Sequence, residues 1–164
     1  MSLTIRPALP EDLPAVHQLA EEIWWPTYSG ILKSEQIRFM LDNMYSIEAL
    51  KEQQAIGTEF LLVERDTKKV AFAGYSCKEE TDKLSIHKLY VHPSEQGKGT
   101  GKFIIHHIEQ IARNLGTRVL ELNVNRYNKA LHFYKKVGFD IFKKEDIPYY
   151  QYWMNDFILQ KHLS

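Results

Sequence analysis

The sequence is poor in the features that mark several classes of protein. It contains one cysteine, Cys77, which excludes an internal disulfide and a cysteine-based metal knuckle. No stretch of about 18 consecutive apolar residues occurs, and the N-terminus lacks the apolar core of a signal peptide. Only 8 glycines and 6 prolines are present, too few for a low-complexity protein. We therefore expect a single domain over residues 1–164, cytoplasmic and without a membrane partner.

An excess of positive charge is also absent. The chain has 21 basic and 21 acidic side chains, so no global positive field attracts nucleic acid, and we expect no nucleic-acid partner. The charge is nevertheless uneven, because the chain through Asp66 holds eleven acidic and five basic residues, a net charge of −6. Either two solvated faces carry opposite charge, or one half of the protein meets a cation and the other an anion.

What is present is a change of hydrophobic period along the chain. Apolar residues first recur every three to four positions and later alternate, which predicts helices followed by strands. Pro26 is expected to end the first helix, because the residue before a proline disfavours helical geometry. In chain order the predicted elements are a strand at 3–6, helices at 10–25, 34–44 and 46–54, strands at 59–64, 70–77 and 84–91, a helix after a glycine-rich loop with Gly116 as its C-cap, a strand at 118–124, a helix ending at Gly138, and strands at 140–144 and 152–159.

The connections between these elements predict how the strands pair. Short polar connections at 66–69 and 79–82 indicate an antiparallel meander. The crossover helix between the strands at 84–91 and 118–124 places those two strands parallel. The whole pattern predicts an α+β domain around a mixed central sheet.

The segment from Leu89 to Lys102 carries the strongest chemical signal. A strand runs into a loop with three alternating glycines, and a helix begins at once. Glycines allow positive φ and close approach of a ligand to backbone N–H groups, and the helix start supplies unpaired donors. The loop is therefore predicted to hold a phosphate or pyrophosphate, with a ligand-free glycine turn as the alternative.

Two common phosphate loops do not fit this segment. A P-loop requires glycine where Gln96 stands and serine or threonine where Phe103 stands. A dinucleotide GxGxxG motif requires its last glycine at Lys102 or Ile104.

The pattern Gln96-x-x-Gly99-x-Gly101 after LeuTyrValHisPro resembles the acetyl-coenzyme A signature of the GNAT superfamily of N-acetyltransferases. A second block from Asn128 to Phe139 is similar to the family's Asn, Ala, Phe–Tyr, Gly–Phe pattern, although Asn128 stands two residues before Ala130 where the family often has three. The resemblance implies a GNAT-like mixed central sheet of about six to seven strands flanked by helices, in three layers α/β/α.

The resemblance also implies direct transfer of an acetyl group from acetyl-coenzyme A to a primary amine. Tyr134 would protonate the leaving thiolate, and Asn128 would bind the pantetheine arm, although packing of Tyr134 and helix capping by Asn128 are alternatives. The pyrophosphate would lie on backbone N–H groups from Gly97 to Lys102. The residues expected to bind the co-substrate are Leu89, Tyr90, Val91, Gln96, Gly97, Lys98, Gly99, Thr100, Gly101, Lys102 and Asn128.

The general base and the acceptor are less defined. Glu121, His87 or a water chain could take the proton of the acceptor ammonium. No metal is expected, because the adjacent histidines His106 and His107 point about 100° apart on a helix.

The acidic N-terminal half favours a small cationic amine, such as a polyamine, as acceptor. Aromatic residues in that half could add cation–π contacts, and the stretch at 149–156 is mildly similar to bacterial polyamine-acetylating members. Two other acceptors stay open, a protein N-terminus and an antibiotic amine. The donor could carry an acyl group other than acetyl, and the protein could form a homodimer. A non-catalytic acyl-coenzyme A sensor is the alternative to an enzyme. The aromatic residues concerned are Trp24, Trp25, Tyr28 and Tyr45. The alternative is that Trp24 and Tyr45 belong to the core and that the acidic side chains are simply solvated.

Overall fold

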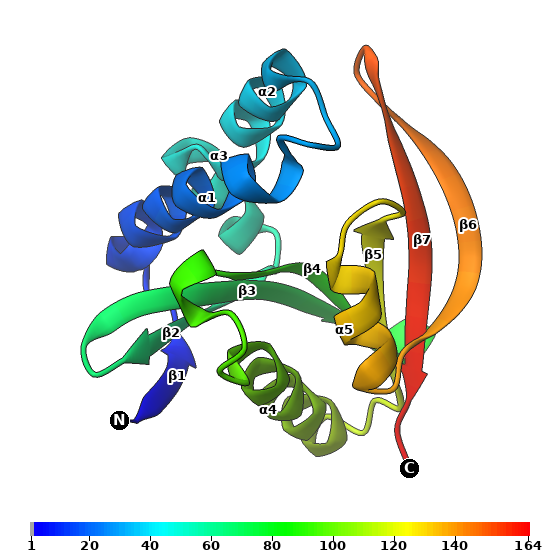
Figure 1. The fold of residues 1–164 in the computed structure, drawn as a ribbon. Helices are drawn as coiled ribbons and strands as arrows, with labels where there is room; N and C mark the ends of the chain where they lie inside the picture. The colour runs from blue at the N-terminus through cyan, green and yellow to red at the C-terminus, as the bar shows by residue number, and fades with distance from the viewer. Residues whose placement is uncertain (1) are drawn as a thin grey trace. The chain divides into compact units, whose positions relative to one another are not determined.

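A computed structural model describes residues 2–164 (Figure 1). Seven strands in these residues form one mixed sheet in the order β1-β2-β3-β4-β5-β7-β6, which confirms the predicted α+β class. The strands are β1 (Leu3–Pro7), β2 (Glu59–Arg65), β3 (Lys68–Lys78), β4 (Lys83–Val91), β5 (Val119–Asn125), β6 (Asp140–Tyr149) and β7 (Tyr152–His162). The helices are α1 (Leu13–Tyr28), α2 (Ser34–Tyr45), α3 (Ile47–Ala55), α4 (Thr100–Asn114) and α5 (Ala130–Lys136), with short 3-10 helices η1 (Pro10–Asp12), η2 (Glu79–Thr81) and η3 (Pro93–Glu95).

The chain divides into two compact units. The first comprises the chain up to Ser76 together with Lys88–Ile104, and the second comprises Cys77–His87 together with Ile105–Ser164. Each unit is built from two separate stretches of chain. That the whole chain behaves as one domain stays a prediction.

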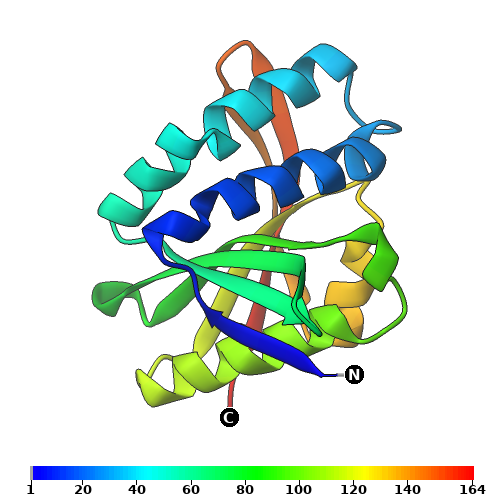
Figure 2. The same cartoon turned by 90° about the vertical axis from the view of Figure 1, so that its left-hand side faces the viewer.

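In the first unit, β1, β2 and β3 pair antiparallel, with β1 on the edge. Helices α1, α2 and α3 lie together on one side of β2 and β3 (Figure 2). Ser46 begins α3 by accepting a hydrogen bond from the backbone N–H of Ala49 at 3.1 Å, which satisfies one of the free donors of the helix start. The apolar faces predicted from the helical spacing are buried, at Leu13, Val16, Leu19, Ile23, Ile37, Met40 and Leu41, whereas Met44 is only half-buried.

The predicted end of the first helix at Pro26 is wrong. Helix α1 continues to Tyr28 with Pro26 inside it. The extra turn is held by tertiary contacts, because the Tyr28 ring is buried and its hydroxyl forms a 2.8 Å hydrogen bond with the hydroxyl of Tyr90. Thr27 also donates from its hydroxyl to the carbonyl of Ile23 at 2.7 Å. These contacts outweigh the helix hydrogen bond that a proline cannot donate.

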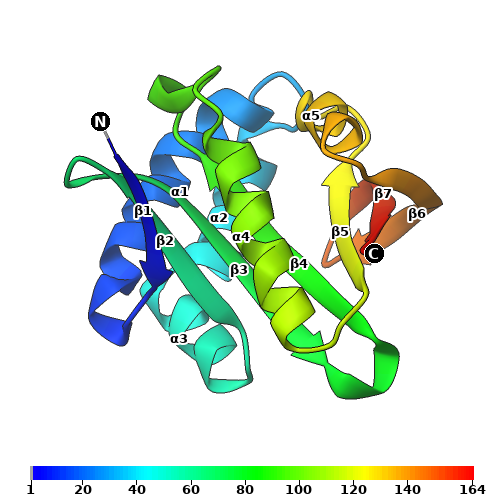
Figure 3. The ribbon, with the colours of Figure 1, turned by 90° about the horizontal axis from the view of Figure 1, so that it is seen from below.

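In the second unit, β4 pairs parallel with β5, as predicted, from Lys83↔Val119 to Ile86↔Leu122. Strand β7 pairs antiparallel with both β5 and β6. Strands β6 and β7 form a hairpin longer than predicted, turning at Tyr150, whose φ is +55°. Strand β5 runs up to the turn that precedes α5 (Figure 3).

Helix α4 ends near its predicted C-cap. Gly116 has φ +75°, the left-handed conformation that glycine adopts without cost. Leu115 lies beyond the helix and is exposed, whereas Ile104, Ile108 and Ala112 carry the buried stripe. No helix in residues 2–164 has the length and apolar character needed to span a membrane.

Candidate functional site

The glycine loop follows β4 in the first unit and has the backbone that its sequence predicts. Gly97 and Gly99 have φ of +76° and +79°, which side-chain-bearing residues rarely adopt. A Cβ atom added to either glycine would meet no atom within 4 Å. The glycines are therefore required by the backbone conformation, and the space beside them is open to a ligand.

The start of α4 supplies donors to that space. The backbone N–H of Phe103 donates to the carbonyl of Gly99 at 3.0 Å and closes the first helical turn. The N–H groups of residues 100–102 precede that turn and point out of the helix end. The predicted run of free donors is interrupted at Lys98, however, because its N–H donates to the carbonyl of Glu95 at 3.2 Å. The residues present therefore fit an anionic group at the helix start.

A buried carboxylate that the sequence analysis missed fixes the base of the loop. Glu95 is 4% exposed and accepts hydrogen bonds from the Thr100 hydroxyl at 2.8 Å and from Arg65 Nε at 2.9 Å. Burial alone would raise the pKa of Glu95, but the hydrogen bonds from Thr100 and Arg65 outweigh it and hold the pKa below its usual range. The Thr100 hydroxyl proton is thus donated to Glu95, and the backbone N–H is the donor that this predicted binding residue keeps for a ligand.

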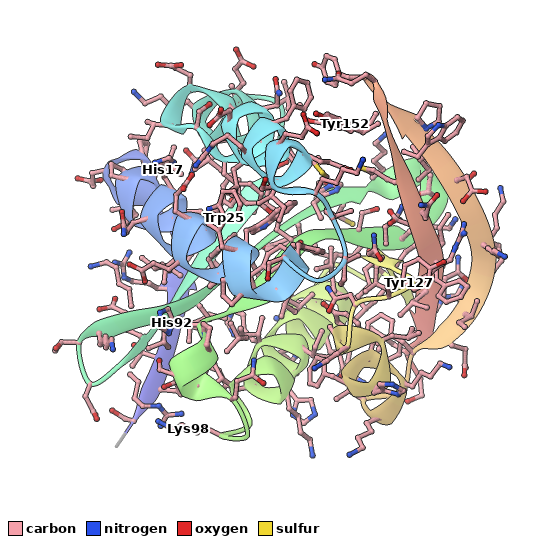
Figure 4. All side chains as sticks on the ribbon, turned by 45° about the horizontal axis from the view of Figure 1, so that its top comes forward. His17, Trp25, His92, Lys98, Tyr127 and Tyr152 are labelled. Atoms are coloured by element: carbon pink, nitrogen blue, oxygen red, sulfur yellow. The ribbon has the colours of Figure 1, made fainter. Side chains whose placement is uncertain are left out.

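The side chains on the outer side of the loop are polar and exposed. Gln96 and Lys102 are exposed, and Lys98 reaches solvent while its Nζ lies 3.7 Å from a carboxylate oxygen of Glu95 (Figure 4). At the other end of the loop, His92 Nε2 lies 3.2 Å from the carboxylate of Glu22. The two lysines add positive charge beside the glycine backbone.

The last residues of β4 are only half-buried at Leu89, Tyr90 and Val91. The Tyr90 ring packs at 5.8 Å from the centroids of both Trp24 and Phe72. Trp24, Tyr28 and Tyr45 are 3%, 7% and 1% exposed, so their faces are buried against one another. The prediction that these three rings form an accessible cation site is therefore wrong, because α1 and α2 use them as core.

Lys88 is buried beside this aromatic cluster. Its Nζ lies 4.4 Å from the centroid of the Tyr45 ring, and the side chain is 9% exposed. No ion pair to Lys88 occurs among the described residues. Burial lowers the pKa of Lys88 from 10.5 to about 8. The chain therefore keeps a desolvated cation at this point of β4.

Replacing Lys88 by methionine is expected to stabilise the protein. At pH 7 the native state holds a charged amine that prefers water, so Lys88→Met should raise the free energy of unfolding by roughly 1–3 kcal/mol after loss of the cation–π contact. The advantage should shrink between pH 8 and 10.5, because the native lysine is then already neutral. Denaturant unfolding at pH 7 and pH 10 measures it. A variant that is less stable at pH 7 would contradict this account of Lys88.

In the second unit, Asn128 shapes the turn before α5. Its side-chain oxygen accepts a hydrogen bond from the N–H of Ala130 at 2.9 Å, and its own N–H donates to the carbonyl of Asn125 at 3.0 Å. This oxygen thus bonds the first residue of α5, as the capping alternative expects, although the N-cap position itself is taken by Lys129, which makes no side-chain capping bond. Tyr127 beside it is 69% exposed.

Tyr134 lies on the buried side of α5. It is 6% exposed, with its ring centroid 5.2 Å from that of Phe133 and 5.7 Å from that of Phe139. The packing alternative is therefore confirmed for the ring. A proton-donor role depends on the hydroxyl alone.

The two candidate bases differ in their surroundings. Glu121 accepts a 2.7 Å hydrogen bond from the side-chain amide of Gln160, and its carboxylate lies 3.3 Å from Lys83 Nζ. Both contacts of Glu121 are therefore made to side chains of its own sheet. His87 is exposed on β4. Within residues 2–164, no group of three or more side chains of the metal-ligating types is placed to hold an ion.

Comparison with known proteins gives a consistent result. Residues 17–139 match the family model described as acetyltransferase (GNAT) family. A spermidine N(1)-acetyltransferase of Thermoplasma acidophilum is 31% identical over 98% of this chain and 98% of its own length. A streptothricin acetyltransferase of Streptomyces lavendulae is 32% identical, over 53% of this chain and 47% of its own. The crystal structure of PaiA N-acetyltransferase from Thermoplasma acidophilum in complex with coenzyme A covers 99% of both chains at 30% identity, with a TM-score of 0.84. This similarity confirms the fold class predicted from the sequence.

Proposed function

Because the chain belongs to the acetyltransferase (GNAT) family and is an acyltransferase, we propose that it moves an acetyl group from acetyl-coenzyme A to a small cationic amine such as a polyamine. The observation that carries the proposed acceptor is the likeness to a spermidine N(1)-acetyltransferase over nearly the full length of both chains. The excess of acidic residues through Asp66 adds support, since a net charge of −6 attracts cations.

The first unit is proposed to hold the donor. The backbone N–H groups of residues 100–102 would bind the pyrophosphate, because they combine free donors with the positive end of α4. The ammonium groups of Lys98 and Lys102 would add screened attraction. The backbone of residues 89–91 would pair with the pantetheine amides as an added strand, and an N–H there would stabilise the tetrahedral oxyanion. The bound co-substrate supplies the thioester that the amine attacks.

The second unit is proposed to supply the proton for the leaving group. An alkyl thiol has a pKa of about 8.5, so a thiolate leaves more readily when a proton donor stands beside it. The hydroxyl of Tyr134 would give that proton. Asn128 would orient the turn before α5 and bind the pantetheine arm with its side-chain amide.

A thiol-release assay tests the proposed reaction. Purified protein is mixed with acetyl-coenzyme A and one of several amines: spermidine, an aminoglycoside, a peptide with a free N-terminus, or a neutral or anionic amine. Free thiol should rise above the hydrolytic background with spermidine and should be accompanied by an acetylated product of matching mass. Coenzyme A binding without thiol release for any amine would mean a sensor rather than an enzyme.

Ionic strength tests the proposed charge of the acceptor. At low salt, spermidine should give a higher kcat/KM than an anionic amine of similar size, because acidic side chains raise its local concentration. Near 1 M salt the Debye length falls to about 3 Å, so the advantage should shrink. Equal rates for anionic and cationic amines at low salt would overturn the cationic acceptor while leaving acetyl transfer intact.

A further inference from the structure

Three carboxylates in the described residues are nine-tenths or more buried, and one of them differs from the other two. Glu95 is paired with Arg65, and Glu109 lies 2.5 Å from Lys161 Nζ. Asp156 on β7 is 7% exposed yet makes no ion pair with any described residue. Burying a carboxylate is costly unless partners replace its hydration, so an unpaired one points to a ligand.

The hydrogen bonds of Asp156 are also few. Among the described residues, its carboxylate accepts one side-chain bond, from Asn123 Nδ2 at 3.4 Å, near the outer limit for such a bond. The nearby guanidinium of Arg126 is turned elsewhere, since it donates to the backbone carbonyl of Asp156 at 3.3 Å and to the Asp146 carboxylate at 2.6 Å. A carboxylate has about four acceptor sites, so Asp156 keeps acceptor capacity for another donor.

The charged and polar groups around Asp156 come from three elements. Asn123 and Asn125 of β5 share its face of the sheet, as the register Asn125↔Asp156 and strand alternation require. Arg126 follows β5, and Glu145 of β6 lies directly opposite Asp156 in the ladder. Burial raises the pKa of Asp156 above its usual value, and Glu145 adds to the rise while Asn123 and Arg126 oppose it.

Asp156 on β7 also lies opposite the last residue of β5, Asn125. The ladder between β4 and β5 ends at Ile86↔Leu122, whereas β5 continues to Asn125. From there the chain enters the turn that leads to α5, and the N–H of Arg126 ties this turn to β7 by donating to the carbonyl of Asn155 at 3.0 Å. Asn123 is exposed, so a molecule in solvent can reach the immediate neighbour of the carboxylate.

We propose that Asp156 binds the ammonium group of the acceptor amine and accepts its proton before acetyl transfer. This inference rests on the proposed function. In the step, one N–H bond of the ammonium breaks, its proton forms an O–H bond on the Asp156 carboxylate, and the nitrogen keeps the electron pair with which it attacks the acetyl carbon. Asp156 then returns the proton to water. A carboxylate whose proton affinity is raised by burial suits this transfer from an amine.

The test compares Asp156→Asn with the control Asp140→Asn, which makes the same substitution at an exposed carboxylate on β6 of the same hairpin. Spermidine binding is measured by calorimetry and acetylation by thiol release, from pH 6 to pH 10. We expect Asp156→Asn to weaken spermidine binding and to lower kcat/KM for spermidine about tenfold at pH 7, with the KM for acetyl-coenzyme A unchanged. The loss in rate should shrink toward pH 10, because a growing fraction of the amine is then already neutral and needs no base. Asp140→Asn should change each value by less than twofold.

The outcomes separate this inference from the proposed function. Spermidine binding that depends on Asp156 without thiol release would support the site and overturn the reaction. Equal binding and equal pH profiles for wild type and Asp156→Asn would overturn the site, whatever the rate. Because removing a buried charge should not lower the melting temperature, the variant is expected to fold. Should it unfold, Asp156→Glu decides: retained spermidine binding with a lower kcat supports the site, and an unchanged kcat overturns it.

Discussion

Substituting Tyr134 with phenylalanine is expected to lower turnover roughly 10²-fold while leaving the affinity for coenzyme A unchanged. Phenylalanine keeps the ring between Phe133 and Phe139, so the packing of α5 is preserved. Only the hydroxyl is lost, and with it the proposed proton donor for the thiolate. General acid catalysis of this kind contributes about 10²–10⁴-fold. Steady-state thiol release gives kcat, and calorimetry gives the coenzyme A affinity.

Tyr127→Phe is the matched control for this substitution. It also removes a tyrosine hydroxyl, but from the turn just before α5 and from a side chain that is 69% exposed. Its kcat and melting temperature should stay at wild-type values. If Tyr134→Phe instead lowers the melting temperature by many degrees and loses rate only in proportion to unfolded protein, the hydroxyl is structural and the donor role is wrong.

Replacing Gly99 by aspartate should weaken coenzyme A binding at least tenfold, or about 1.4 kcal/mol. The substitution places a Cβ atom and a carboxylate in the open space beside the loop, where the pyrophosphate is proposed to lie. The new charge repels the phosphates, and the φ of +79° adds strain to any residue with a side chain. Isothermal titration of coenzyme A measures the change.

Gly116→Asp separates loss of the ligand site from backbone strain. Gly116 ends the same helix with φ +75°, and a Cβ atom there would also meet nothing within 4 Å. This variant should lose stability in a similar way but bind coenzyme A as the wild type does. Gly99→Ala, with strain and no charge, should fall between wild type and Gly99→Asp. Equal coenzyme A affinity for Gly99→Asp and wild type would remove the loop from the binding site.

Several features of the candidate site could be predicted from local sequence. Three alternating glycines between a strand and a helix specify a loop with positive φ, and the structure has that backbone at Gly97 and Gly99. The capping role open to Asn128 also follows from its place just before a helical run, and its side chain accepts a bond from Ala130. The loop backbone and the Asn128 bond depend on neighbours within a few residues, so both can be predicted from the local sequence pattern.

The burial of the aromatic and acidic residues could not be predicted from local sequence. Trp24 and Tyr45 have the same sequence appearance in a core as in an accessible cage, and only the packing of α1 against α2 buries them. Helix α1 likewise continues beyond Pro26 because the hydroxyl of Tyr28 forms a hydrogen bond with the hydroxyl of Tyr90, which lies 62 positions later in the sequence. Local propensity contains no information about such a partner.

Local sequence patterns were enough to predict the order of strands and helices along the chain, the glycine loop, the parallel β4–β5 crossover and the family. The pairing of the buried charges became visible only in the folded chain. Arg65 pairs with Glu95 across 30 residues and Lys161 with Glu109 across 52, whereas the carboxylate of Asp156 forms no ion pair among the residues described. The physical reason is that local hydrophobic period and turn chemistry act within a few residues, while the burial and pairing of a carboxylate depend on which distant strand or helix is brought beside it.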